Sequence, residues 1–185
     1  SNAGNSVSTY SQPILQTLTT HFNQTVFVAQ LFDFEVRSVA MAFPNSADQA
    51  YIQPGRVMPT HAAASAKAIW AFQDESKIEF ILKNERLKFS KHTIVEEDNV
   101  RAEFERVRQR GYAICNQEMG NGLLSYACPA DIQGTGVIFS IAVVGTVPSL
   151  KKYPRNEIIS SLREATQEFA RNYPASLGKI VDNQR

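Results

Sequence analysis

The feature that most restricts the fold is a series of three strand-like runs in the second half of the chain. They are residues 112–118, 123–129 and 136–145, and all three are rich in aliphatic and aromatic side chains. Met119-Gly120-Asn121-Gly122 and Gln133-Gly134-Thr135-Gly136 connect them, and such glycine-rich segments suit tight turns. Parallel strands need a crossover of a dozen residues or more, so connections this short imply antiparallel neighbours. The pattern predicts a three-stranded antiparallel meander.

The first half of the chain predicts an opening helix followed by a hairpin. Ile14, Leu18 and Phe22 recur every four residues within 10–23, which indicates an amphipathic helix. Residues 25–32 and 35–43 are rich in Val, Phe and Ala, and Asp33 between them suits a turn. An irregular segment, 44–55, is expected to hold a short strand at Tyr51-Ile52.

Further helices are predicted between the hairpin and the meander and after the meander. They are 62–72 with Thr60 as N-cap, 75–82, 100–110 with Gly111 as a left-handed C-cap, and 154–173. The whole order predicts an α+β domain with one mostly antiparallel sheet and helices packed on it. This domain is expected to span 4–174, with 175–185 as a tail. The segment Ser1-Asn2-Ala3 is typical of the remnant left by removal of a tag.

Charge and cysteine content exclude several classes of protein. Lys plus Arg is 19 and Asp plus Glu is 18, so this chain lacks the bulk positive field of a duplex-binding surface. Its two cysteines are too few for a disulfide scaffold and suit a reducing cytosol. No signal peptide or apolar run of about 20 residues is present, so we expect a cytoplasmic protein without membrane contact.

Alternation along the three meander strands separates a bulky face from a face of small residues. The small face collects Ala113, Cys115, Ser125, Ala127, Ser140 and Ala142. If these positions align across the strands, they leave space above the sheet for a small ligand. The alternative is that a helix packs closely on them and leaves no space. The same alternation places Cys115 and Cys128 on opposite faces, which argues against a disulfide between them.

The segment entering the helix at 62–72 is a second candidate wall of a ligand site. The run Thr60-His61-Ala62-Ala63-Ala64-Ser65 carries little side-chain bulk. Unpaired backbone N–H groups at a helix N-terminus attract anions, so a carboxylate could dock there. The alternative is an Ala-rich helix packed tightly against the sheet.

Several motifs occur in the order and approximate spacing of one family. Residues 58–71 read Met-Pro-Thr-His-Ala-Ala-Ala-Ser-Ala-Lys-Ala-Ile-Trp-Ala, and 107–113 read Val-Arg-Gln-Arg-Gly-Tyr-Ala. Lys91-His92-Thr93-Ile94, Gln117-Glu118, Gly122, Ala127-Cys128-Pro129 and 141–145 complete the set. The first run resembles the Leu-Pro-x-His-x-x-Ala-x-Gly-Lys-Ala-x-Leu-Ala signature of the IclR family of bacterial transcription regulators, and the others are similar to further stretches of that family.

The resemblance covers roughly 10–173 and corresponds to the family's C-terminal effector-binding and oligomerisation domain. It implies a GAF/profilin-like fold, a small-molecule effector and self-association to a dimer or tetramer. It also implies that DNA is bound only through a winged helix-turn-helix domain on the N-terminal side, which this chain does not contain. The effector-binding positions that it implies are Met58, Ala64, Ser65, Cys115, Ser125, Ala142 and Val144.

Three departures from the signature bear on the ligand. Ala66 stands where the family has Gly, Met58 replaces Leu, and Trp70 replaces a smaller apolar residue. Ala142 and Val144 occupy positions that carry hydroxyls in some relatives. A less polar pocket would favour a larger or aromatic acid over an acid of two or three carbons.

Catalysis and metal binding have weak support in the sequence. Cys115 with His61 is the one pairing that suggests a nucleophile and a base, and no flanking motif accompanies it. The histidines and cysteines have no recognised short spacing of metal ligands. We therefore expect no catalytic residues, no metal site and no cofactor. A free-standing GAF-like sensor, and a small hydrolase or transferase using Cys115, are the alternatives.

Charged residues on two of the predicted helices have simple interpretations. Lys67 lies on an Ala-rich helix and is expected to point to solvent. Arg106, Arg108 and Arg110 complement the negative end of a helix dipole, and contact with DNA or a partner is the alternative.

Overall fold

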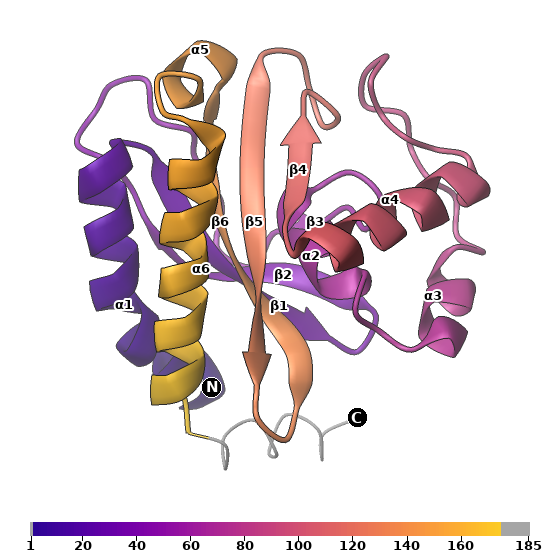
Figure 1. Ribbon diagram of the computed structural model, residues 1–185, viewed down its shortest axis with the longest axis horizontal. Coiled ribbons are helices and arrows are strands. Elements are labelled where there is room, and N and C mark those ends of the chain that lie inside the picture. The colour runs from indigo at the N-terminus through magenta and orange to yellow at the C-terminus, as the bar shows by residue number, and fades with distance from the viewer. Residues whose placement is uncertain (1, 175–185) are drawn as a thin grey trace.

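The computed structural model describes residues 2–174, which form one antiparallel sheet with helices on both faces (Figure 1). The spatial order of the strands is β3-β2-β1-β6-β5-β4. The strands are β1 Thr25–Phe32, β2 Glu35–Ala42, β3 Val57–Met58, β4 Ala113–Asn116, β5 Leu123–Ile132 and β6 Gly136–Thr146. The helices are α1 Asn2–Phe22, α2 Ala64–Trp70, α3 Glu75–Ile81, α4 Glu97–Arg110, α5 Val147–Leu150 and α6 Arg155–Asn172. The predicted α+β class and antiparallel sheet are confirmed.

Helices α1 and α6 cover one face of the sheet and α2 covers the other (Figure 1). On the α6 face, Phe139 packs edge-on against Phe169 and Tyr173, with ring centroids 5.2 Å apart in both pairs. On the opposite face, α2 contacts β4, β5 and β6, and α4 packs behind α2. None of the described helices combines the length and apolarity that a membrane span requires.

The predicted meander is present, and its register sets the two faces. Ala113 pairs with Ala127 and Ala127 with Ala142, so three small side chains form one row across β4, β5 and β6. The next row in the same direction joins Cys115, Ser125 and Val144. The small-residue face predicted from alternation is therefore continuous across the three strands.

Helix α2 covers only part of that face. The side-chain hydroxyl of Ser140 donates to the backbone carbonyl of Ser65 at 2.9 Å, which fixes the helix close to the sheet. The alanine row, Ala113, Ala127 and Ala142, is completely buried. Close helix packing and open space, the two interpretations of the small residues, therefore apply to different rows. Helix α2 packs on the alanine row, and the row of Cys115, Ser125 and Val144 lies beyond the helix.

Several local predictions are wrong. Tyr51-Ile52 is not a strand; instead β3 pairs Met58 with Val36 and Val57 with Arg37. Helix α2 begins at Ala64, and Thr60 is not its cap, because the Pro59 carbonyl accepts the N–H groups of Ala62 and Ala63 in a preceding turn. The opening helix begins at Asn2 and not at residue 10, and α5 was not predicted. The predicted tail, 175–185, lies outside the described residues.

Close packing of α2 on the alanine row has a measurable consequence. Ala127→Leu places a branched side chain where the helix leaves no space, and we expect it to lower the free energy of unfolding by about 1–3 kcal/mol. Urea denaturation measures this change. Ala102→Leu on the exposed side of α4 is the matched control and should change stability by less than about 0.5 kcal/mol. Equal stability of the two variants would contradict the packing.

Candidate functional site

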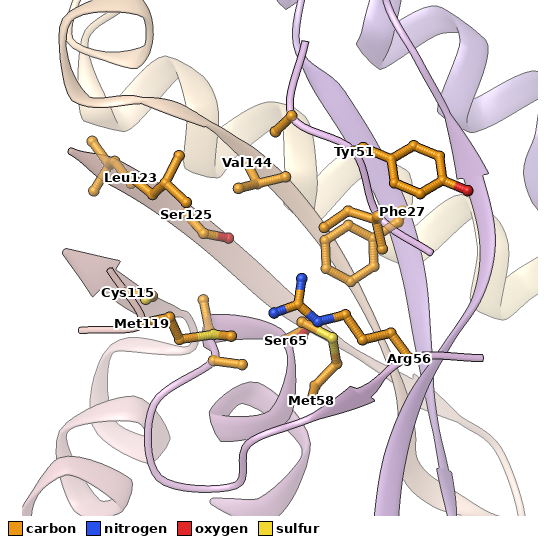
Figure 2. A pocket seen from close by; sticks show the side chains of 15 residues that line it. Phe27, Tyr51, Arg56, Met58, Ser65, Cys115, Met119, Leu123, Ser125 and Val144 are labelled. Atoms are coloured by element: carbon orange, nitrogen blue, oxygen red, sulfur yellow. The ribbon is translucent and has the colours of Figure 1, made fainter. Parts of the chain in front are cut away.

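A cavity of about 220 Å³ opens beside the first turn of α2, above the part of the sheet that the helix leaves uncovered (Figure 2). Its inner walls are buried: Phe27 is 2% exposed, Ser65 1% and Cys115 5%. Tyr51 and Leu123, which are 66% and 41% exposed, mark its open side. The lining residues are Phe27, Ala50, Tyr51, Ile52, Arg56, Met58, Ala63, Ala64, Ser65, Cys115, Met119, Leu123, Leu124, Ser125 and Val144.

The structure brings six of the seven sequence-predicted effector positions together around this cavity. They are Met58 from β3, Ala64 and Ser65 from α2, Cys115 from β4, Ser125 from β5 and Val144 from β6. The seventh, Ala142, does not line it. It lies in the alanine row under α2 and is 0% exposed, so the structure separates Ala142 from the other six positions.

The floor of the cavity offers little reactive chemistry. The Ser125 hydroxyl donates to the Val143 carbonyl at 2.9 Å, which leaves its oxygen free to accept a further hydrogen bond. Burial raises the pKa of the Cys115 thiol, and the Glu118 carboxylate raises it further. Cys115 is therefore a neutral thiol near pH 7 and a weak nucleophile.

The suggested pairing of Cys115 with His61 is not present. The His61 imidazole hydrogen-bonds to the Leu87 carbonyl at 2.8 Å and stacks on Phe89, with ring centroids 5.8 Å apart. Burial lowers the pKa of His61, although the bond to Leu87 acts in the opposite direction. In the described part of the chain, no three His, Cys, Asp or Glu side chains gather as metal ligands.

Arg56 lines the cavity, and the sequence analysis missed it. Gly55, at φ +75°, ends a turn just before it. The backbone N–H of Arg56 donates to the Ser38 hydroxyl, and its carbonyl accepts the Ser38 N–H, both at 3.0 Å. Figure 2 shows its side chain extending across the cavity with the guanidinium near the centre. A lone basic residue between Pro54-Gly55 and the apolar Val57-Met58 was the available signal.

Ser65 carries a hydroxyl that is both buried and without a hydrogen-bond partner. Its backbone carbonyl accepts the bond from Ser140, but its own Oγ is buried without a hydrogen bond. A buried hydroxyl without a partner costs free energy unless a ligand or water satisfies it. Ser65 therefore offers the cavity an unused donor and acceptor.

Lys67 is fully buried, which corrects the prediction that it points to solvent. Its ammonium donates to the Glu118 carboxylate at 2.8 Å and to the Ile114 carbonyl at 2.5 Å, and lies 3.9 Å from Glu103. Glu118 in turn accepts the N–H of Asn116 at 3.0 Å. These contacts, the Lys67 network, join α2 to β4 and to the connection between β4 and β5.

The arginines at the end of α4 are engaged within the domain. Arg106 and Arg110 pair with Glu103 at 2.9 and 3.2 Å, and Arg108 donates to the Ala71 carbonyl at 2.8 Å. Burial on its own would raise the pKa of Glu103, but Lys67 and the two guanidinium groups outweigh it and hold the pKa low. These contacts give the arginine cluster a role inside the fold.

Comparison with known proteins decides the family. The profile of the bacterial transcriptional regulator IclR C-terminal family matches residues 4–171, almost the whole described chain. The chain belongs to this family. The matched region includes the residues that line the cavity and those of the Lys67 network.

Individual IclR relatives agree in fold and differ widely in sequence. The p-hydroxybenzoate hydroxylase transcriptional activator of Acinetobacter baylyi is 25% identical over 86% of this chain and 61% of its own. An IclR homolog from Microbacterium hydrocarbonoxydans, solved with 4-hydroxybenzoate, has a TM-score of 0.82 at 16% identity, covering 91% of this chain and 68% of that one.

A third comparison is with an isolated domain. A double mutant of the PobR inducer-binding domain from Acinetobacter, solved with 3-hydroxybenzoic acid, has a TM-score of 0.76 at 23% identity, covering 86% of this chain and 94% of that one. By contrast, the chain spans only 40% to 62% of the length of curated relatives that it matches. The similarity is therefore to one domain of longer regulators.

The departures from the IclR signature are accommodated by burial. Ala66 and Trp70 are both 0% exposed in α2, so the family's Gly position carries a methyl group that packs inside the fold. Met58 lines the cavity from β3. Neither Ala66 nor Trp70 lines the cavity, so these two substitutions act on the packing of α2 and not on the ligand's surroundings.

Removing the charge at Lys67 should destabilise this IclR domain strongly. Lys67→Met leaves the carboxylates of Glu118 and Glu103 buried without their ammonium partner, and we expect a loss of about 3–5 kcal/mol. Denaturant unfolding measures it. Adding Glu118→Gln should recover part of the loss, because it removes one uncompensated charge.

Arg101→Met is the control, since the pair of Arg101 with Glu97 is partly exposed and should contribute less than about 1 kcal/mol. A small effect of Lys67→Met, equal to that of Arg101→Met, would contradict the importance of the network.

Both thiols should resist alkylation in the folded protein. Cys115 and Cys128 are buried, and burial raises the pKa of Cys128 to about 12. Since the thiolate is the reactive form, iodoacetamide near neutral pH should react roughly tenfold or more slowly with the native protein than with the denatured chain. Mass spectrometry over time measures both rates. Rapid native labelling of Cys115 would contradict a neutral, enclosed thiol.

Proposed function

We propose that the cavity binds a small organic acid, with a single-ring aromatic acid favoured over acids of two or three carbons, and that the domain thereby senses this effector. The observation that carries the proposal is the cavity itself. At about 220 Å³ it is below the range of about 300–1,000 Å³ typical of drug-sized ligands, which suits a single ring. Phe27, Met58 and Val144 contribute apolar walls, and few polar groups face the space.

The relatives support an aromatic acid. The Microbacterium homolog was solved with 4-hydroxybenzoate and the PobR domain with 3-hydroxybenzoic acid. The Acinetobacter baylyi relative is named for the activation of p-hydroxybenzoate hydroxylase. Those ligands belong to those proteins; for this chain they identify the compounds to test first.

The domain acts through a shift between arrangements of subunits. We propose that it self-associates to a dimer or tetramer within a longer regulator, and that DNA is contacted by a separate N-terminal domain. An effector that binds one arrangement more tightly increases the population of that arrangement and so changes the spacing of the DNA-binding parts. The helix-turn-helix names of longer relatives support this division of roles.

The site favours binding without turnover. Catalysis by Cys115 would require a thiolate and a nearby base, whereas its thiol pKa is raised and His61 is bonded to Leu87. The Ser125 hydroxyl, also on the floor of the cavity, donates to a backbone carbonyl and not to a base. We therefore propose no enzymatic activity.

Calorimetric titration tests the ligand class. Benzoate and 4-hydroxybenzoate are expected to bind more tightly than pyruvate and acetate, because the ring displaces water from apolar walls that the small acids leave unfilled. Tightest binding of acetate or pyruvate would refute the aromatic preference. Binding by none of the four acids would refute the organic-acid proposal.

Ala64→Trp is expected to abolish this binding, because the indole occupies the cavity beside the first turn of α2. Its circular dichroism spectrum should remain that of the unsubstituted protein. Ala102→Trp on the exposed surface of α4 is the matched control and should bind normally. Unchanged binding by a folded Ala64→Trp variant would place the site elsewhere.

A further inference from the structure

Arg56 is the one charged residue among the described residues that line the cavity. Its side chain has no hydrogen bond or ion pair with the described part of the protein. Other arginines are engaged: Arg37 pairs with Glu35, Arg101 with Glu97 and Arg110 with Glu103. An arginine held at a cavity without a carboxylate partner leaves its guanidinium available to a ligand.

The backbone holds Arg56 in place although its side chain is exposed. Its N–H and C=O both bond to Ser38, and the Ser38 hydroxyl also donates to the Gln53 carbonyl at 2.6 Å. Arg37 donates to the Gly55 carbonyl at 3.0 Å and supports the same turn. The starting point of the side chain is therefore defined, and Figure 2 shows the guanidinium directed into the cavity.

The other positive groups near the cavity are less suited to an anion. The Lys67 ammonium is enclosed by Glu118 and the Ile114 carbonyl. The turn before α2 has already used the N–H groups of Ala62 and Ala63 on the Pro59 carbonyl. Within residues 2–174, the guanidinium of Arg56 is the remaining cation that faces the space.

A second polar group complements the guanidinium. Ser65 lines the same cavity, and its Oγ is buried without a hydrogen-bond partner. A carboxylate has two oxygens with about four acceptor sites in total, so it can accept from a guanidinium and from a hydroxyl at once. The burial of Ser65 without a partner is then explained by the ligand.

We infer that Arg56 and Ser65 together form the carboxylate subsite of this cavity, and that they orient a planar aromatic monocarboxylate with its ring toward Phe27 and Val144. The inference rests on the proposed function and adds the position of the charge. A hydroxyl on the far side of the ring would find the Ser125 oxygen, which still has acceptor capacity because its own proton is donated to Val143. The ligand is thus recognised at its carboxylate end by charge and at its other end by hydrogen bonding.

Benzoate and its neutral counterpart benzamide separate charge recognition from ring recognition. The unsubstituted protein should bind benzoate more tightly than benzamide. Arg56→Gln should lose roughly 10- to 100-fold in benzoate affinity, the range of a charge-assisted hydrogen bond, while its benzamide affinity stays within about twofold. The benzoate affinity of Arg56→Lys should lie between those of the unsubstituted protein and Arg56→Gln, since an ammonium keeps the charge but not the two-pronged geometry.

Ser65→Ala should weaken benzoate binding by a smaller factor, roughly three- to tenfold for a single hydrogen bond. Arg101→Gln, on α4 and outside the cavity, is the matched control and should bind both compounds normally. Added salt should weaken benzoate binding to the unsubstituted protein more than to Arg56→Gln.

The outcomes distinguish this subsite from the proposed function. If benzoate binds Arg56→Gln as tightly as the unsubstituted protein, while Ala64→Trp still abolishes binding, the cavity is the site but Arg56 does not hold the carboxylate. An equal loss of benzoate and benzamide affinity in Arg56→Gln also overturns the inference, because it shows a structural role. Absence of benzoate binding to the unsubstituted protein overturns this inference, and absence of binding of all four organic acids refutes the proposed function as well.

Discussion

The buried ammonium of Lys67 is the interaction on which the arrangement of the cavity depends. It joins three elements and one connection: it starts from α2, donates to β4 and to Glu118 in the connection after β4, and faces Glu103 of α4. A charge removed from water this completely is tolerated only while all its partners remain in place. The first turn of α2, which carries Ala64 and Ser65, and the segment with Met119, which follows Glu118, are thereby held as two walls of one space.

The cavity exists because a short helix covers a longer sheet. Helix α2 has seven residues and is about 10 Å long, whereas the ten residues of β5 extend over about 33 Å. The helix packs on the alanine row, and its first turn borders the row of Cys115, Ser125 and Val144 without covering it. Residues 50–58 then close the space from the side of β2 and bring Arg56 into it. Among the described residues, the result is a set of apolar walls with one buried, unpartnered hydroxyl and one free guanidinium.

Much of this organisation was predictable because it is encoded locally. Alternation and glycine-rich turns indicated the meander, and its pairing then placed Cys115 beside Ser125 and Ser125 beside Val144. The family resemblance supplied Met58, Ala64 and Ser65. The short strand and the helix start were misplaced because residues 44–63 lack a periodic pattern, and long-range bonds decide their course. The Thr25 hydroxyl, for instance, donates to the Ala50 carbonyl at 2.5 Å. Val57 and Met58 pair with β2 and so form an edge strand.

The sequence by itself determined the class of fold, the two faces of the meander and the family, since all three depend on periodicity and on motifs in a fixed order. Only the tertiary structure decided which small residues face a cavity, because that depends on where α2 begins over the sheet: Ala142 lies under the helix and Val144 lies outside it. It also decided that Lys67 is buried and Arg56 is unpaired. The sequence gives the charge of a side chain, but the groups that pair with it lie on elements far apart in the chain and meet it only in the folded structure.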